Sequence, residues 1–223
     1  MIHWRYFISR KAGLSRDEFF TYWRKRHPRA VSERIPWIKR YVQSHGLLEP
    51  AGDSPYEGIA ELWTESLDGL RALLTSAQMA ALIRDEENFI DRQHVEYLTT
   101  RDIVVLDGPR TPGMVKGIWP NKRKAGMSVA EYRRYWAEVH APMALKLPGL
   151  RRYERSETLD ELYQYAEPRW DGVAQLWFDD AAAAQRFLQS DEFLKGTWAD
   201  GENFVSSVTT LWAQEHLLIW PNE

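Results

Sequence analysis

Two stretches of the chain carry nearly the same sequence: KAGLSRDEFFTYWRKRH at residues 11–27 and KAGMSVAEYRRYWAEVH at residues 124–140. They are offset by 113 residues (140 − 27), about half of the 223-residue chain. A repeat of this length indicates a duplicated domain. We therefore predict two domains, at residues 1–109 and 114–223, joined by a short linker that contains Pro112 and ends at Gly113.

Each copy begins with a signal for the start of a helix. Ser and Glu stand three residues apart, at 15 and 18 and again at 128 and 131, which is the spacing of a capping box. Helical spacing i, i+4, i+8 then places an aromatic residue, a Trp and a His on one face of each helix. These triplets are Phe19, Trp23 and His27 in the first copy and Tyr132, Trp136 and His140 in the second. We predict that each helix ends at its histidine, because a proline follows closely in both copies.

The two histidines are the first candidates for chemistry. Carbonyl groups at a helix C-terminus favour the charged imidazolium, whereas burial beside Trp opposes it. Both effects act in the pH range where histidine titrates, as an acid–base residue requires. The alternative for His27 and His140 is a structural role, with one ring nitrogen bound to a carbonyl. Tyr22 and Tyr135 are weaker candidates as hydroxyl donors, because they lie a turn away from the aromatic stripe.

The rest of the chain repeats one order of elements. Alternating apolar residues predict strands at 2–9, 40–48, 56–63 and 97–106 in the first half and at 115–119, 150–156, 170–178 and 212–220 in the second. Helical spacing covers 67–74, 79–90 and 181–188, and irregular links are expected at 32–37 and 49–55.

The order βαββαβ in each half is that of the ferredoxin-like split βαβ motif. Helices then cover one face of each antiparallel sheet, and the other face must be covered too. The predicted fold class is α+β, with two tandem ferredoxin-like domains that pack as an internal pseudo-dimeric α/β barrel.

Composition narrows the class of protein. A net charge of −3 with no basic face argues against nucleic acid as a partner. The absence of Cys removes disulfides and thiolate chemistry and fits a cytoplasmic protein. No run approaches the roughly 20 apolar residues of a membrane span, and the N-terminus does not read as a signal peptide. The aromatic content of 13% indicates that some rings line a pocket for a small hydrophobic or aromatic substrate.

The repeated motif resembles that of a known family. The pattern G-[LM]-S-x-x-E-[FY]-x-x-Y-W-x-x-x-H, followed by Ala141 and Pro142 in the second copy, is similar to the EthD-like family of the dimeric α/β-barrel superfamily. The resemblance covers both halves and implies a pocket between the sheet and the first helix, near His27, His140 or both. The first copy departs from the pattern after its histidine, which favours His140. That superfamily contains dehydratases, cyclases, isomerases, cofactor-free monooxygenases and haem enzymes, so the resemblance leaves the reaction open.

Further candidates recur at equivalent positions of the two halves. Tyr41 and Tyr153 could donate a hydrogen bond to a substrate oxygen, with Arg40 or Arg152 beside them; the alternative is a buried Tyr next to an exposed Arg.

The remaining candidates are substrate-binding residues. Trp23 and Trp136 are either core residues or a wall on which a flat substrate stacks. Glu61 shares its strand face with Trp63, as Gln175 does with Trp177, and it would be either paired with an Arg or a base of raised pKa.

We expect no cofactor and no metal. The six histidines have none of the common metal-ligand spacings, and no phosphate-binding loop or nucleophile elbow is present. Haem bound through a single histidine remains an alternative.

Three functions fit these residues. The first is a cofactor-independent lyase or isomerase that moves a proton on a small aromatic or polyene carbonyl compound. The second is a cofactor-free monooxygenase acting on a phenol or anthrone, and the third is a non-catalytic small-molecule-binding protein. The fusion of two domains can satisfy the dimer within one chain, and a further homodimer is left open.

Overall fold

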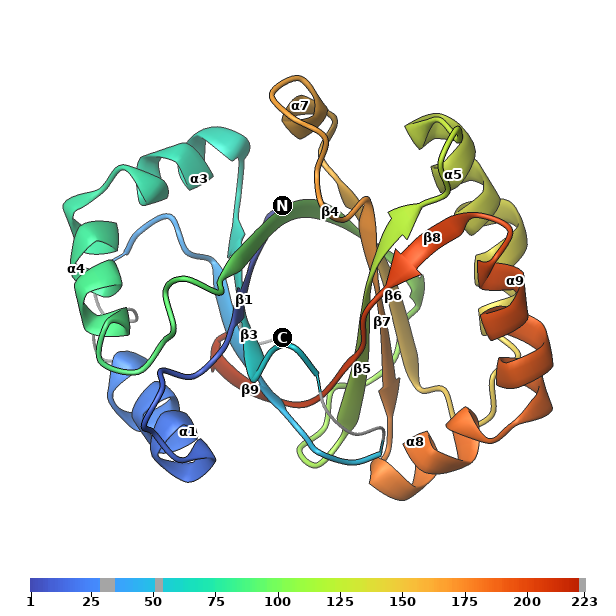
Figure 1. Ribbon diagram of the computed structural model, residues 1–223, viewed down its shortest axis with the longest axis horizontal. Coiled ribbons are helices and arrows are strands. Elements are labelled where there is room, and N and C mark those ends of the chain that lie inside the picture. The colour runs from blue at the N-terminus through green and yellow to red at the C-terminus, as the bar shows by residue number, and fades with distance from the viewer. Residues whose placement is uncertain (29–34, 51–53, 221–223) are drawn as a thin grey trace. The chain divides into compact units, whose positions relative to one another are not determined.

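The computed structural model describes residues 1–28, 35–50 and 54–220 and confirms the predicted α+β class (Figure 1). The predicted links at 32–37 and 49–55 lie partly outside these residues. The chain divides into two compact units. Unit one comprises Met1–Gly46, Pro55–Thr99 and Glu215–Glu223, and unit two comprises Leu47–Ser54 and Thr100–Gln214. Each unit has an antiparallel sheet with helices on one face, as a ferredoxin-like repeat requires.

Unit one contains the first repeat. Its strands are β1 (Ile2–Ile8), β2 (Arg40–Gly46), β3 (Gly58–Thr64) and the start of β4 (Glu96–Leu106). Its described helices include α1 (Arg16–Lys25), α3 (Leu67–Leu74) and α4 (Ala77–Glu86). The strand order is β4-β1-β3-β2, with the end of β9 (Leu211–Ile219) next to β2. The β1–β3 register runs from Ile2 opposite Thr64 to Ile8 opposite Gly58.

Unit two contains the second repeat. Its strands are β5 (Val115–Arg123), β6 (Arg152–Thr158), β7 (Gly172–Phe178), β8 (Val205–Val208) and the start of β9. Its helices are α5 (Val129–Tyr135), η1 (Trp136–His140), α6 (Ala141–Ala144), α7 (Asp160–Tyr163), α8 (Ala181–Leu188), η2 (Glu192–Trp198) and α9 (Ala199–Gly201). β7 pairs with β5 and β6, β9 and β8 pair with β5, and the end of β4 pairs with β6. Thus β4 passes from unit one to unit two after Thr99, and β9 passes back after Gln214.

Both capping boxes are present at the predicted residues. The predicted helix end before Pro142 is wrong. The helix continues from α5 through the π-helical turn η1 and into α6, which ends at Ala144. Pro142 occupies the first turn of α6, where a missing N–H costs little because the wider π turn precedes it. Besides α6, the sequence pattern missed α7, in the connection between β6 and β7, and η2, α9 and β8 near the end of the second repeat.

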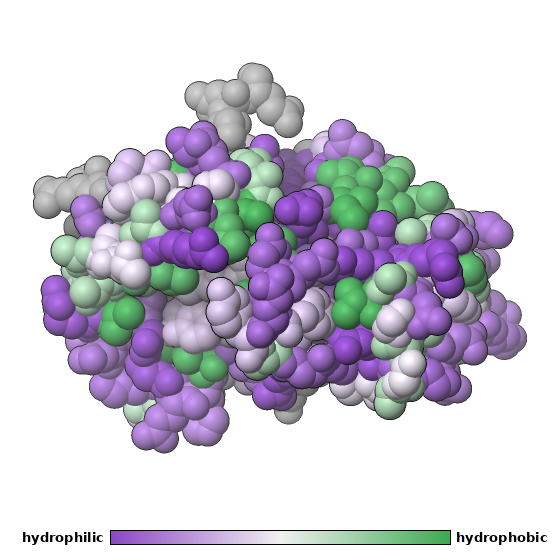
Figure 2. Space-filling view, turned by 90° about the horizontal axis from the view of Figure 1, so that it is seen from above, coloured by the Kyte–Doolittle hydropathy of each residue, from purple (hydrophilic) through white to green (hydrophobic). Residues whose placement is uncertain are grey.

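The core of unit two lies between its sheet and its helices. Its largest members are aromatic, and Tyr132, Trp136 and Phe178 are almost fully buried. Gly172 on β7 makes this packing possible, because a Cβ there would lie 2.5 Å from the Trp136 ring. On the face drawn in Figure 2, hydrophobic residues form patches separated by hydrophilic ones. Within the described residues, every helix is too short or too polar to span a bilayer.

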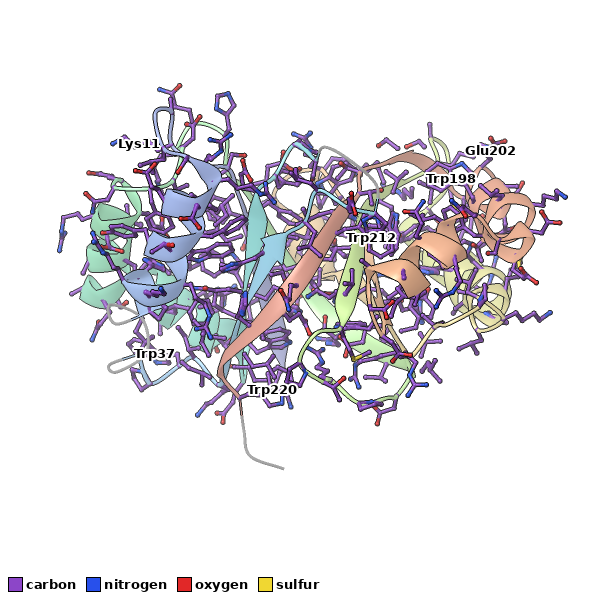
Figure 3. The ribbon with its side chains drawn as sticks, turned by 90° about the horizontal axis from the view of Figure 1, so that it is seen from below. Lys11, Trp37, Trp198, Glu202, Trp212 and Trp220 are labelled. Carbon is purple, nitrogen blue, oxygen red and sulfur yellow. The ribbon has the colours of Figure 1, made fainter. Side chains whose placement is uncertain are left out.

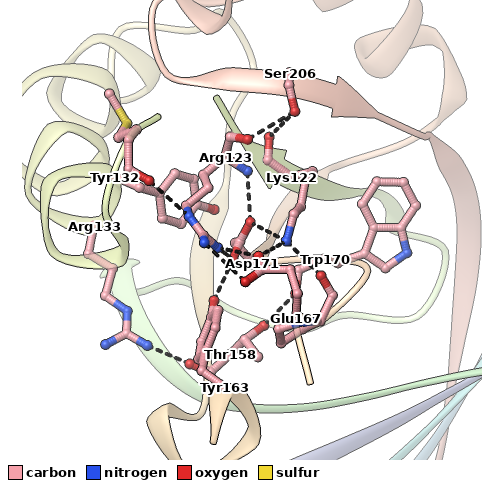
Figure 4. A network of polar contacts seen from close by, with 12 residues as sticks. Lys122, Arg123, Tyr132, Arg133, Thr158, Tyr163, Glu167, Trp170, Asp171 and Ser206 are labelled. Atoms are coloured by element: carbon pink, nitrogen blue, oxygen red, sulfur yellow. Dashed lines mark hydrogen bonds and ion pairs between the residues drawn. The ribbon is translucent and has the colours of Figure 1, made fainter. Parts of the chain in front are cut away.

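A polar network anchors the connection between β6 and β7, which contains α7 (Figure 4). Asp171 is fully buried at its centre. Its carboxylate forms ion pairs with Lys122, at 3.1 Å, and with Arg123, and it accepts a hydrogen bond from the Tyr163 hydroxyl. A buried carboxylate is stable only with such partners. The network fixes the end of β5 next to Asn121, a wall residue of the cavity described below.

Candidate functional site

Unit two contains a cavity of about 230 Å³ between its helices and its sheet. Sheet residues form one wall, and residues of the helices η1, α6, α8, η2 and α9 form the other. The lining is mostly aromatic and aliphatic and includes Trp119, Asn121, Trp136, His140, Ala144, Leu147, Tyr153, Ala174, Leu176, Phe187, Phe193, Thr197, Trp198, Gly201, Glu202, Phe204, Val205, Ser206, Ser207 and Val208. Figure 3 shows Trp198 and Glu202 close together on the outer helical layer, with Trp212 nearer the sheet. An apolar cavity with a few polar groups is the usual form of a small-molecule site.

His140 is the titratable group with the most defined partner in this wall. Its Nδ1 lies 2.8 Å from Oδ2 of Asp200, and Oδ1 of Asp200 accepts a hydrogen bond of 2.7 Å from the Tyr135 hydroxyl. Asn203 donates a second hydrogen bond to Oδ1, at 3.1 Å. With Nδ1 bound to Asp200, Nε2 is the ring nitrogen left for whatever occupies the cavity.

The electrostatics of the pair keep His140 neutral and Asp200 ionised near pH 7. Burial lowers the pKa of His140, and the contact with Asp200 only partly opposes this. Burial alone would raise the pKa of Asp200, but hydrogen bonds from Tyr135, His140 and Asn203 outweigh it and lower that pKa. An ionised Asp200 requires a proton on Nδ1, so Nε2 carries a lone pair and can act as a base.

Tyr153 provides a second polar group in the wall. Its hydroxyl oxygen accepts a hydrogen bond of 2.8 Å from Nε1 of Trp136. Burial raises the pKa of Tyr153, so its hydroxyl stays protonated. Because Trp136 donates to the oxygen, the Tyr153 proton is available to an acceptor in the cavity. His140 and Tyr153 therefore supply a base and a hydrogen-bond donor to the same apolar space.

Unit one contains the same arrangement of His, Asp and Tyr, but the cavity beside it is much smaller. Nδ1 of His27 lies 2.7 Å from Asp85, which also accepts a hydrogen bond of 2.9 Å from Tyr22. The equivalent cavity, lined by His27, Trp23 and Tyr41 among others, measures only about 20 Å³.

Glu86 is one of the residues that line this small cavity. It reaches the Tyr6 hydroxyl at 3.1 Å and forms an ion pair with Arg92. Burial raises the pKa of Glu86, and Arg92 opposes that rise. Gly201 takes the equivalent position in unit two, where it has no side chain to fill the cavity.

Five predicted substrate-binding residues are placed elsewhere: Arg40, Arg152, Glu61, Trp63 and Trp177. None of them lines either cavity in the described part of the chain. Strand alternation is the reason, because Ala60 and Leu62 of β3 face the helices and their neighbours face the other way. Glu61 contacts Nε2 of His3 at 3.4 Å and forms an ion pair with Arg5 at 3.8 Å. Arg40 and Arg152 stack on Trp220 and Trp177 respectively. The structure does bring His140, Tyr153 and Trp136 together.

Sequence reasoning missed the aspartates and the residues of η2 that line the cavity. The signal for the aspartates was present, since Asp85 and Asp200 each stand two residues before the repeated Glu-Asn-Phe motif. Thr197 and Trp198 gave no comparable signal, because the first repeat has different residues, Leu82 and Ile83, at the equivalent positions.

The described residues offer no group of three His, Cys, Asp or Glu side chains that could hold a metal ion. The polar residues of the cavity wall are suited to an organic ligand, to which they can donate and from which they can accept hydrogen bonds.

A known family model matches both repeats of the chain. The model of the EthD domain matches residues 11–93 and again residues 124–207, most of both repeats. The chain belongs to the EthD family. The resemblance inferred from the repeated motif is thereby confirmed, and this EthD protein carries the domain twice in tandem. The search of curated proteins found no match.

Solved structures share the fold over nearly the whole chain. An anthrone oxidase-like protein has a TM-score of 0.64 at 10% identity, covering 97% of the EthD protein and 92% of its own chain. A candidate monooxygenase from Fusobacterium nucleatum has a TM-score of 0.62 at 5% identity, with 97% and 93% covered. A mutant chlorite dismutase from Candidatus Nitrospira defluvii has a TM-score of 0.56 at 9% identity, with 96% and 91% covered. At these identities the likeness concerns the fold.

Proposed function

We propose that this EthD-family protein is a cofactor-independent enzyme that removes a proton from a small, flat, mostly apolar carbonyl or phenolic compound in the cavity of unit two. The observation that carries the proposal is the contact between Nδ1 of His140 and Asp200, in the wall of an aromatic cavity that also contains the Tyr153 hydroxyl. A neutral histidine held in one tautomer by a carboxylate is a suitable general base.

The reaction follows from the two polar groups. Nε2 of His140 takes a proton from a carbon next to the carbonyl, and the electron pair of that C–H bond moves onto the carbonyl oxygen. Tyr153 donates a hydrogen bond to this oxygen and stabilises the enolate. The aromatic walls hold the ring of the substrate and exclude water, which strengthens both interactions. Asp200 stabilises the imidazolium that forms.

The fate of the enolate decides the class of enzyme. Return of the proton to a different carbon gives an isomer, and loss of hydroxide, which takes the proton from His140 and leaves as water, gives a dehydration. These lyase or isomerase outcomes need no other reactant. His27 is not assigned this role, because the equivalent cavity in unit one measures only about 20 Å³.

Oxygenation of the same anion is the second candidate. An anthrone or phenol that has lost a proton is electron-rich and can itself reduce O₂. A C–H carbon of the ring becomes a carbonyl with one oxygen atom, and the other oxygen atom leaves as water with the two hydrogens lost, so the protein would contribute the base and the cavity. The descriptions of two proteins of the same fold, an anthrone oxidase-like protein and a candidate monooxygenase, favour this outcome. Both candidates begin with the same proton transfer.

The test is untargeted mass spectrometry of a host metabolite extract incubated with the wild-type protein or with His140→Gln, with and without air. Loss of water, or an unchanged mass with a shifted retention time, in the wild-type sample alone would support the lyase or isomerase. Gain of oxygen that requires air would support the monooxygenase. Identical extracts from the two proteins would contradict the role of His140 and favour a non-catalytic binding protein.

A further inference from the structure

The cavity of unit two has a polar group that the proposed proton transfer does not use. Thr197 lies on η2, lines the cavity and is only 6% exposed. Its Oγ1 atom is buried, and it has no hydrogen-bond partner in the described part of the chain. A buried hydroxyl without a partner costs free energy, so such groups are rare in native structures and point to a partner that binds there.

The geometry of η2 explains how Thr197 came to line the cavity. Ser76 and Ser190 are offset by 114 residues, whereas Asp85 and Asp200 are offset by 115, so the second repeat has one extra residue between them. The first repeat forms a regular α-helix, α4, over this segment. The second repeat absorbs the extra residue in the π-helix η2. Such π-helical insertions are frequent at functional sites.

The insertion changes the residues that the helix presents to the cavity. With the 115-residue offset, Thr197 replaces Leu82, an apolar wall residue of unit one. The same helical segment continues to Gly201, which replaces Glu86. The second repeat has thus lost an apolar side chain and a space-filling carboxylate and gained an unpartnered hydroxyl.

The charge of the wall restricts the partner of Thr197. No Lys or Arg is present among the described residues that line this cavity, whereas Glu202 is. An anionic group would enter without a counter-charge and would be repelled by Glu202. A neutral hydroxyl or carbonyl oxygen fits both the Thr197 hydroxyl and the apolar surroundings.

We propose that Thr197 is a specificity-determining residue that binds a second neutral oxygen of the ligand, separate from the oxygen that meets Tyr153. The inference rests on the proposed function for the site and names the substrate class more closely: a flat aromatic compound with at least two hydroxyl or carbonyl groups. His140 and Tyr153 act on the carbon and oxygen of one carbonyl group, and Thr197 binds the second oxygen.

The test compares binding of 1-naphthol with that of a set of dihydroxynaphthalenes, measured by calorimetry or quenching of Trp fluorescence. His140→Gln is the background, so that turnover does not disturb the titrations. We expect at least one dihydroxynaphthalene to bind more tightly than 1-naphthol by roughly 3- to 10-fold, the value of one neutral hydrogen bond. Thr197→Val should abolish this preference and leave 1-naphthol binding unchanged, and Thr197→Ser should keep the preference.

The inference would be overturned by a preference that survives Thr197→Val, or by the absence of any preferred dihydroxynaphthalene when Thr197 is intact. Thr197→Ala replaces Thr197→Val if the valine variant does not fold, and circular dichroism checks both. Binding and turnover separate the two proposals. Loss of the preference for dihydroxynaphthalenes in Thr197→Val tests the role of Thr197 alone. Turnover that persists in His140→Gln would contradict the proposed proton transfer and would not bear on Thr197.

Discussion

The two repeats of this protein share a polar triad and differ in the space beside it. Each has a Tyr, an Asp and a His joined by hydrogen bonds of 2.7–2.9 Å. The cavity next to His140 measures about 230 Å³, and the one next to His27 about 20 Å³. The triad is therefore part of what both repeats inherited, and it does not by itself mark a working site. Room for a ligand is what distinguishes unit two.

The largest effect should follow from removing the base of unit two. His140→Gln should lower turnover by the roughly 10²–10⁴-fold that a general base contributes. The matched variant His27→Gln should leave turnover within about twofold, because no ligand reaches that histidine in unit one. Steady-state kinetics on the substrate found by mass spectrometry would check both. Equal losses in the two variants would contradict the distinction between the repeats.

Filling the cavity of unit two should have the next largest effect. A Cβ added at Gly201 meets no atom within 4 Å, so Gly201→Glu can place in this cavity the side chain that Glu86 places in unit one. We expect ligand binding to weaken by roughly 5- to 100-fold, from the 1–3 kcal/mol typical of overpacking. Calorimetry with a dihydroxynaphthalene measures this, with Gly201→Ala as the smaller control. Unchanged affinity in Gly201→Glu would place the ligand outside this cavity.

The carboxylate of Asp200 should change the pKa of His140 and so its strength as a base. His140 acts as a base only when neutral, so kcat/KM should fall as the pH drops through a pKa that burial holds below 6.5. Asp200 raises that pKa, so Asp200→Asn should move the fall to lower pH and lower the plateau, because a weaker base removes the proton more slowly. Asp85→Asn serves as the control in unit one. A fall at the same pH in wild type and Asp200→Asn would exclude His140 as the titrating base.

The smallest effect on activity should come from opening unit one. Glu86→Gly removes the partner of Tyr6 and Arg92, and we expect a loss of about 1–3 kcal/mol in the free energy of unfolding with turnover unchanged. Glu86→Gln keeps the volume of the side chain and should be less destabilising. Urea denaturation measures the free energy of unfolding, and steady-state kinetics measure turnover. Turnover that rises in Glu86→Gly would indicate that His27 becomes active once it has space.

The sequence alone predicted more of the fold than of the site. The capping boxes, the aromatic stripe and the alternating strands are local patterns, and α3 and α8 have the predicted bounds. The candidate site depends on contacts between distant residues, such as the 60-residue separation of His140 and Asp200. Strand alternation places Glu61 and Trp177 on one side of their strands, and the sequence pattern does not say whether that side faces the helices and the cavity. The π-helix η2 follows from one inserted residue, which only the alignment of the two repeats reveals.

The number of ligand molecules bound per chain shows whether the cavity of unit two alone is the functional site. Calorimetric titration of His140→Gln with the preferred dihydroxynaphthalene gives the number of sites per chain and their affinity. We expect one site per chain, weakened by Gly201→Glu and retained in Glu86→Gln. Two equal sites per chain, or one site that Gly201→Glu leaves intact, would contradict the claim that the cavity of unit two is the functional site.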